Sequence, residues 1–227
     1  MTAGVLRAGI NLGNALLAGP DPATGEPRGI AVDLARALGR HLGVDVKLVT
    51  YESAARMADA AAGGAWDAAF LAADAARADI DFTEPYLEID ATYLVDGASP
   101  LREVSEVDRA GVRIAVSDKS AYDLALRRVI TRAQIVPAPT VDASVDRFFA
   151  ERLDVLAGLR PLLVRVAEEH PGCRLLEGRF TAVRQAIGTP KGRDLAPIAA
   201  FVRDARASGM IAELIERHGV RGVTAAS

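Results

Sequence analysis

An alternation of strand-like and helix-like segments constrains the fold of this chain more than any other feature. Residues 5–10 (VLRAGI) read as a strand, and residues 29–43 carry apolar side chains at helical spacing up to Gly43. Residues 44–51 (VDVKLVTY) read as a second strand, and the pattern continues to residues 194–219, which predict two helices. Strand and helix in repeated succession predict an α/β fold with parallel or mixed sheets and helices on both faces.

The strands form two groups, which predicts two lobes. We expect residues 1–91 and 188–227 to form one lobe and residues 96–183 the other, with crossover strands at about 92–95 and 184–187. Two α/β lobes joined by two strands leave a cleft between them, and the C-terminal ends of the strands are expected to face it.

Composition limits the classes of function. Of 227 residues, 50% are apolar and 25% charged, as in ordinary globular domains, and a formal net charge of −3 gives no global basic field for nucleic acid. The single cysteine, Cys173, excludes an internal disulfide and a cysteine-rich metal site. The three histidines lack metal-ligand spacing and no phosphate-binding loop is visible, so no cofactor is expected. No stretch has the length of a membrane span or of a signal-peptide core, so the chain either stays in the cytoplasm or has lost a leader.

Five segments, in order, resemble the family 3 solute-binding proteins of ABC importers, a group that includes many polar amino-acid receptors. The resemblance covers nearly all of the chain, at residues 25–51, 63–70, 74–86, 111–124 and 184–219. It implies a two-lobed fold of the type II periplasmic-binding-protein kind. It also implies a monomeric periplasmic receptor that closes over a small solute by hinge motion and presents it to a membrane permease.

Arg77 is the principal candidate for a ligand contact. Asp74, three residues earlier, is expected to cap the turn that presents it. A guanidinium donates a planar pair of hydrogen bonds to a carboxylate, and in the family the matching arginine grips the carboxylate of the ligand. We expect the Arg77 side chain to face a solvent-filled cleft; a surface ion pair with Asp79 or Asp81 is the alternative.

Ser120 is the candidate from the other lobe, because it lies between a predicted strand and a predicted helix. It can cap that helix and offer backbone N–H groups to an anion, or act as a cap alone. The family usually has glycine before this residue, whereas this chain has Lys119, which either adds charge to an anion site or is solvated.

The resemblance places further candidates around the ligand. Tyr51 matches an aromatic lid, and Asn11 and Asn14 lie in the first strand-to-helix loop, where they suit a polar ligand group or hydrogen-bond the turn. Ala72 replaces a polar contact of the family. Where many amino-acid receptors hold the ligand ammonium with an aspartate, this chain has Arg160, either a second anion contact or a surface side chain.

Three classes of function follow from these residues. The first is a receptor that binds a small carboxylate-bearing solute, an amino acid or a related organic acid. The second is an enzyme on the same fold, similar to the cyclohexadienyl dehydratases, with Glu84 or Asp74 as the acid; no paired base is visible. The third is a cytoplasmic small-molecule sensor.

Overall fold

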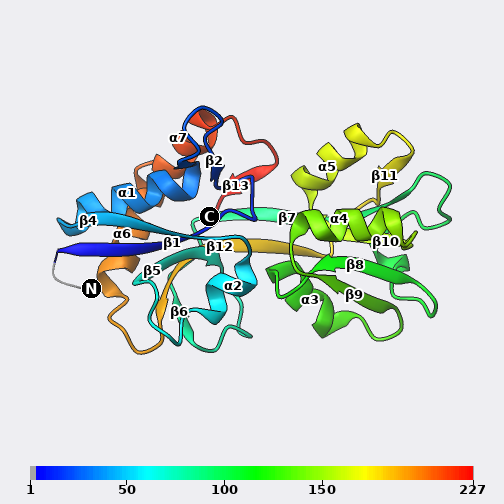
Figure 1. Cartoon of the computed structure of the whole chain (residues 1–227), viewed down its shortest axis with the longest axis horizontal. Helices are drawn as coiled ribbons and strands as arrows, with labels where there is room; N and C mark the ends of the chain where they lie inside the picture. The colour runs from blue at the N-terminus through cyan, green and yellow to red at the C-terminus, as the bar shows by residue number, and fades with distance from the viewer. Residues whose placement is uncertain (1–3, 227) are drawn as a thin grey trace. The chain divides into compact units, whose positions relative to one another are not determined.

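The computed structural model describes residues 4–226, and its chain divides into two compact units. The first unit comprises the chain up to Glu88 together with the chain from Arg184 onward, and the second comprises Ile89–Val183. Figure 1 shows that each unit is built of strands flanked by helices, so the α/β fold expected from the sequence is confirmed.

The first unit is built on a sheet with the strand order β4-β1-β5-β12. The strand β1 pairs in parallel with both of its neighbours, while β12 runs antiparallel to β5 and to the short β6. The strands of this sheet are β1 (Val5–Asn11), β4 (Asp45–Tyr51), β5 (Ala68–Ala72), β6 (Ile80–Phe82) and β12 (Thr181–Pro190), the last of which begins in the second unit.

Helices cover both faces of this sheet (Figure 1). The helix α1 buries Ile30, Leu34 and Leu38 on one stripe, and it ends at Gly43 in the left-handed conformation that glycine adopts without strain. It packs against β4 and against the two C-terminal helices, while α2 contacts β1 and β4. The helices of this unit are α1 (Ile30–Leu42), α2 (Ala54–Asp59), α6 (Ala196–Ala207) and α7 (Met210–Arg217).

The second unit has the strand order β7-β10-β8-β9, with β8 parallel to both β9 and β10. Its core contains Leu94, Phe148 and Leu156. Its strands are β7 (Leu87–Asp96), which begins in the first unit, β8 (Arg113–Ser117), β9 (Gln134–Ala138), β10 (Val155–Leu159) and β11 (Cys173–Leu175). Its helices are the 3-10 turn η1 (Val104–Glu106), α3 (Ala121–Val129), α4 (Val141–Ala150) and α5 (Arg160–Glu169).

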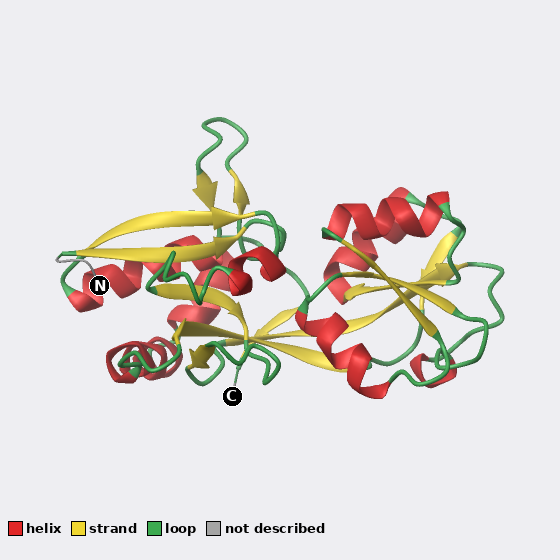
Figure 2. Ribbon diagram, turned by 60° about the horizontal axis from the view of Figure 1, so that its bottom comes forward, coloured by secondary structure: helices red, strands yellow, loops and turns green. Residues whose placement is uncertain are grey.

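Several elements differ from the sequence-based expectation. The pattern at residues 53–64 predicts a helix of that length, but α2 ends at Asp59, ahead of the Gly63-Gly64 pair. The two crossing strands are each 10 residues long, longer than predicted. A hairpin of β2 (Gly19–Pro20) and β3 (Pro27–Arg28), which stands out in Figure 2, was not predicted, nor was β13 (Val223–Ala225).

Asp108 joins two loops of the second unit through a cluster of hydrogen bonds. Its carboxylate accepts from the N–H groups of Ala133 at 2.9 Å, Arg132 at 2.7 Å and Thr131 at 3.1 Å, and from the Thr131 hydroxyl at 2.9 Å. The N–H groups of Ala133 and Arg132, with those of Thr131 adding to them, hold the pKa of the Asp108 carboxyl well below its usual range.

This lowered pKa predicts a specific dependence of stability on pH. Because the folded-state pKa lies below the unfolded value, the contribution of Asp108 to the free energy of unfolding is full above the unfolded pKa of about 4 and is lost as the pH falls further. Asp108→Asn should therefore lower the free energy of unfolding at pH 7 and reduce its decline below pH ~4. Urea unfolding across this pH range measures both effects, with Asp146→Asn, on the exposed side of α4, as the control. Parallel pH profiles for Asp108→Asn and the parent would contradict the assignment.

Candidate functional site

Three candidate residues of the first unit lie at one edge of its sheet. Asn11 and Tyr51 are the last residues of β1 and β4, and they are partners in the parallel register of these strands. Ala72 ends β5, which runs parallel to β1 on its other side. Because the three strands point the same way, their C-terminal ends bring these residues to the same edge, as expected for a ligand site on an α/β sheet.

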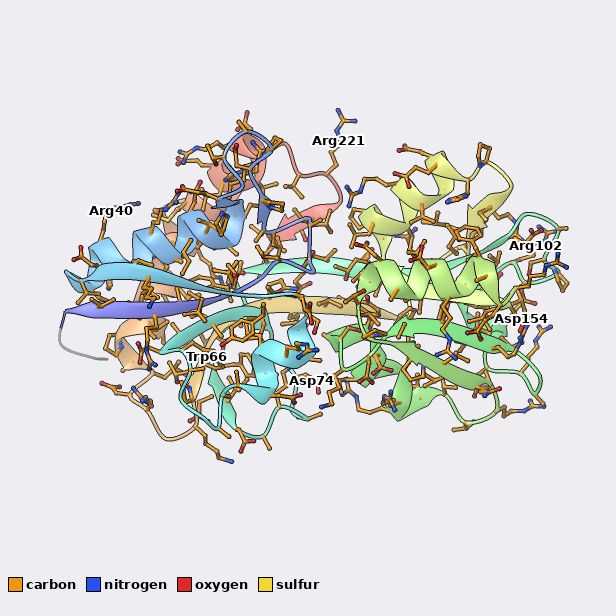
Figure 3. The ribbon with its side chains drawn as sticks, viewed as in Figure 1. Arg40, Trp66, Asp74, Arg102, Asp154 and Arg221 are labelled. Atoms are coloured by element: carbon orange, nitrogen blue, oxygen red, sulfur yellow. The ribbon has the colours of Figure 1, made fainter. Side chains whose placement is uncertain are left out.

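Arg77 is presented by a tight turn directly after β5. The carboxylate of Asp74, which is labelled in Figure 3, accepts a hydrogen bond from the N–H of Ala76 at 2.9 Å, so Asp74 caps the turn as predicted. The Asp74 carbonyl accepts from the N–H of Arg77 at 3.0 Å, and the Arg77 carbonyl accepts from the N–H of Ile80 at 3.1 Å. These bonds fix the backbone from which the guanidinium extends.

The Arg77 side chain is buried, which contradicts the expectation that it faces solvent. Its relative exposure is 7%, and its guanidinium donates to the backbone carbonyl of Ala72 at the end of β5. Burial lowers the pKa of Arg77 to about 10, and the nearby charge of Asp74 opposes this effect. Arg77 therefore stays a cation at neutral pH, in surroundings where water screens its charge only weakly.

A hollow of about 580 Å³ opens beside this turn, within the first unit. Its lining includes the three cationic residues Arg77, Arg184 and Lys191. Arg184 is exposed and forms an ion pair with Glu88 at 3.0 Å. Arg184 and Lys191 were not among the predicted residues, since only the pairing of β12 with β5 and β6 brings them next to Arg77. The full lining is Ala73, Asp74, Ala75, Arg77, Ala78, Ile80, Asp81, Phe82, Pro85, Arg184 and Lys191.

The loop after β1 places its two asparagines differently. The side-chain oxygen of Asn11 accepts a hydrogen bond from the N–H of Gly13 at 3.0 Å. This is the hydrogen bond within the turn that the sequence analysis gave as the alternative to ligand binding. The side-chain oxygen of Asn14 is buried and has no hydrogen-bond partner among the described residues. Tyr51 is half-buried against the cluster that contains Trp66, and this burial raises the pKa of its hydroxyl. Asn14 thus retains a free acceptor, whereas the Asn11 oxygen is engaged within the loop.

The candidates of the second unit also gather at one edge, because β8 and β10 are parallel. Ser120 follows β8, is 7% exposed, and caps α3 by accepting from the N–H of Asp123 at 3.1 Å. Lys119, just before it, has a φ of 51°. Arg160 follows β10 as the first residue of α5; its guanidinium donates to the carbonyl of Gly178 and lies 4.0 Å from the Asp90 carboxylate. The Arg160 side chain thus has partners within its own unit.

The two residues considered as catalytic acids, Asp74 and Glu84, both lie between β5 and β7. The Asp74 carboxylate caps the Arg77 turn, and Glu84 is exposed next to Thr83, whose hydroxyl donates to the Glu84 carbonyl at 2.8 Å. His218 contacts the Asp33 carboxylate at 2.9 Å, at the C-terminal end of α7. Residues 4–226 include no cluster of three or more metal-ligating side chains. Nor does any helix in that range have the length and apolarity to cross a membrane.

Comparison with solved structures shows the same fold in amino-acid-binding proteins. The substrate-binding protein of an amino acid ABC transporter is 18% identical, with a TM-score of 0.80 over 94% of this chain and 98% of that chain. A putative binding component of an ABC transporter from Wolinella succinogenes, complexed with lysine, is 21% identical, with a TM-score of 0.80 over 95% of each chain. An ancestral arginine-binding protein bound to glutamine is 18% identical, with a TM-score of 0.81 over 98% of this chain and 100% of that chain. The fold is therefore that of the type II periplasmic-binding proteins.

Comparison with sequence families identifies the group to which the chain belongs. No curated protein matches the chain. The sequence model of the bacterial extracellular solute-binding proteins, family 3, matches residues 19–221, which is most of the chain. The chain therefore belongs to the family 3 bacterial extracellular solute-binding proteins.

Proposed function

We propose that the chain is the receptor of an ABC importer and binds a small solute that carries a carboxylate, either an amino acid or a related organic acid. In this proposal it works outside the cytoplasmic membrane, delivers its solute to a membrane permease and is a monomer. The two compact units serve as the two lobes of the receptor. Family membership and the amino-acid ligands of proteins with the same fold support this assignment.

The observation that carries the ligand class is the Arg77 guanidinium beside the hollow in the first unit. It is cationic, shielded from water and held by a turn that its own backbone and Asp74 define. A guanidinium in this setting binds a carboxylate with two parallel charge-assisted hydrogen bonds, which are stronger than bonds between neutral groups. The rigid turn reduces the conformational entropy that ligand binding must remove.

The remaining candidates supply the rest of the site in this proposal. Ser120 and the backbone N–H groups at the start of α3 supply an anion-binding contact from the second unit. The unpaired side-chain oxygen of Asn14 accepts from an N–H group of the ligand, such as an ammonium. Tyr51 supplies an aromatic wall.

A thermal-shift screen with matched pairs of ligands tests the requirement for a carboxylate. We begin with L-lysine and L-glutamine, the ligands of two structures with this fold, and add L-glutamate. A true ligand at a hundredfold excess over its Kd should raise the melting temperature by roughly 5–10 °C. The counterparts in which every carboxylate is replaced by a carboxamide, L-lysinamide for L-lysine and L-glutaminamide for both L-glutamine and L-glutamate, should give no shift. Equal shifts from an acid and its carboxamide would contradict the proposed role of the carboxylate.

A further inference from the structure

The turn that joins β8 to α3 contains a residue in an unfavourable backbone conformation. Lys119 has a φ of 51°, in the left-handed region that residues with a Cβ rarely adopt. For such residues this conformation is disfavoured by a factor of about 5 to 30 in population. Contacts within the turn must therefore stabilise this conformation of Lys119.

The buried carboxylate of Asp123 provides such a contact. One of its oxygens accepts from the N–H of Lys119 at 2.8 Å, and the N–H of Asp123 donates to the Ser120 hydroxyl at 3.1 Å. The side chain of Asp123 is fully buried. The pair of bonds resembles a helix capping box, shifted so that the acid binds the residue before the cap. Asp123 thus binds the left-handed residue through its side chain and Ser120 through its backbone.

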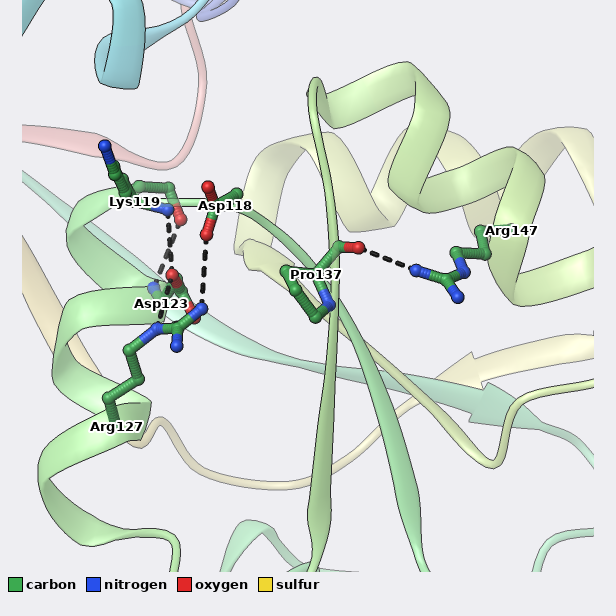
Figure 4. A network of polar contacts seen from close by, with 7 residues as sticks. Asp118, Lys119, Asp123, Arg127, Pro137 and Arg147 are labelled. Carbon is green, nitrogen blue, oxygen red and sulfur yellow. Dashed lines mark hydrogen bonds and ion pairs between the residues drawn. The ribbon is translucent and has the colours of Figure 1, made fainter. Parts of the chain in front are cut away.

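Arg127 holds the Asp123 carboxylate in place, as Figure 4 shows. Its Nε donates to both oxygens of Asp123, at 2.9 Å and 3.0 Å, and its Nη2 lies 3.2 Å from the Asp118 carboxylate. Asp118 therefore contacts the same arginine as Asp123, whereas the bond to the N–H of Lys119 comes from Asp123. This difference makes Asp118 a matched control for any change at Asp123.

We propose that Asp123 is a positioning residue for ligand binding: through the N–H of Lys119 it holds the turn that presents Ser120 and the first N–H groups of α3. The inference rests on the proposed function, in which this turn contacts the ligand. Glycine adopts the left-handed conformation freely, whereas this chain reaches it with the help of a buried acid.

A cycle of variants tests the proposal. The variants are Asp123→Ala, Lys119→Gly, the double variant and Asp118→Ala, each titrated by calorimetry with L-lysine, L-glutamine and L-glutamate. For an amino acid that binds the parent, Asp123→Ala should weaken binding by about tenfold, since the left-handed turn loses its support. The double variant should bind within about twofold of Lys119→Gly, and Asp118→Ala should bind within about twofold of the parent. A purely structural role for Asp123 does not predict this rescue by glycine.

Two results would overturn the inference. One is unchanged affinity in Asp123→Ala, and the other is a double variant that binds as weakly as Asp123→Ala. If Asp123→Ala does not fold, Asp123→Leu takes its place with the same expectations, because an aliphatic side chain fills the buried position but offers no acceptor to the N–H of Lys119.

Hydrogen exchange at the Lys119 amide separates this inference from the proposed function. Failure of the parent to bind any of the three amino acids counts against the proposed function, and exchange then decides the role of Asp123 by itself. We expect the Lys119 amide to be protected in the parent and to exchange faster in Asp123→Ala. Equal protection in both proteins would overturn the inference.

Discussion

Replacing Arg77 with lysine is expected to weaken the binding of a carboxylate ligand by roughly 30-fold or more. Lysine keeps the positive charge, but its ammonium cannot form the two parallel hydrogen bonds of a guanidinium. The effect is large because Arg77 is 7% exposed, so the interaction takes place where water screens charges weakly. Calorimetric titration with the acid that gives the largest thermal shift measures the loss.

The same hollow offers a matched control for this experiment. Arg184 also lines it, but its side chain is exposed and pairs with Glu88 at 3.0 Å. Arg184→Lys should therefore change the affinity by no more than about twofold, as expected for an exposed ion pair. If Arg77→Lys and Arg77→Ala both bind the acid as tightly as the parent, the carboxylate anchor is elsewhere, and Arg160 becomes the next residue to test.

Folding of these variants needs a separate check, because the structure places Arg77 differently from the sequence-based expectation. The guanidinium donates to the carbonyl of Ala72, so Arg77→Ala leaves that buried carbonyl without this bond, a loss of about 1–3 kcal/mol. Lysine retains a donor that can reach the same carbonyl. Comparing the unfolding free energies of the two variants therefore separates the loss of stability from the loss of binding.

The elements with strong periodicity are the ones that the sequence predicted well. The helix α1 is one example. Its apolar stripe of Ile30, Leu34 and Leu38 and its terminal Gly43 are signals within one helix, so they can be recognised without knowing what the helix packs against. The hairpin of β2 and β3 escaped prediction since each of its strands has two residues, too few for any period to show. The third missed strand, β13, has three residues and is paired with β7, far away along the chain.

The candidate site was predictable where its geometry is local. The Asp74 cap lies three residues before Arg77, so the turn could be inferred from adjacent residues. Arg184 and Lys191 reach the same hollow only because β12 pairs antiparallel with β5 and β6, a register that spacing along the chain does not encode. The role of Asp123 depends on the φ of Lys119, which is a property of the folded backbone.

Gly29→Ala is expected to have the largest effect on stability among the changes considered. Gly29 precedes α1 with a φ of 128° and a ψ of 178°, a backbone region that is essentially restricted to glycine. A Cβ added there would lie 2.4 Å from the carbonyl oxygen of Leu17 and 2.9 Å from the Cα of Ala18. Backbone atoms cannot move aside as a flexible side chain can. Strain and overpacking together should lower the free energy of unfolding by about 3 kcal/mol or more, as measured by urea denaturation.

Gly43→Ala separates the close backbone contact from the conformational preference of glycine. Gly43 also has a positive φ, 67°, but no atom lies within 4 Å of a Cβ added at this position. Its replacement should therefore lower the free energy of unfolding by only about 1–2 kcal/mol, the penalty of the left-handed conformation alone. The Leu17 carbonyl that Gly29 approaches also accepts a hydrogen bond from the N–H of Ala31 at 3.0 Å, so it links the loop after β1, which contains Asn14, to the start of α1. If Gly29→Ala and Gly43→Ala lower the free energy of unfolding equally, the backbone at Leu17 moves to accommodate the added methyl group. The hydrogen bond between Leu17 and Ala31 would then not hold the loop rigidly.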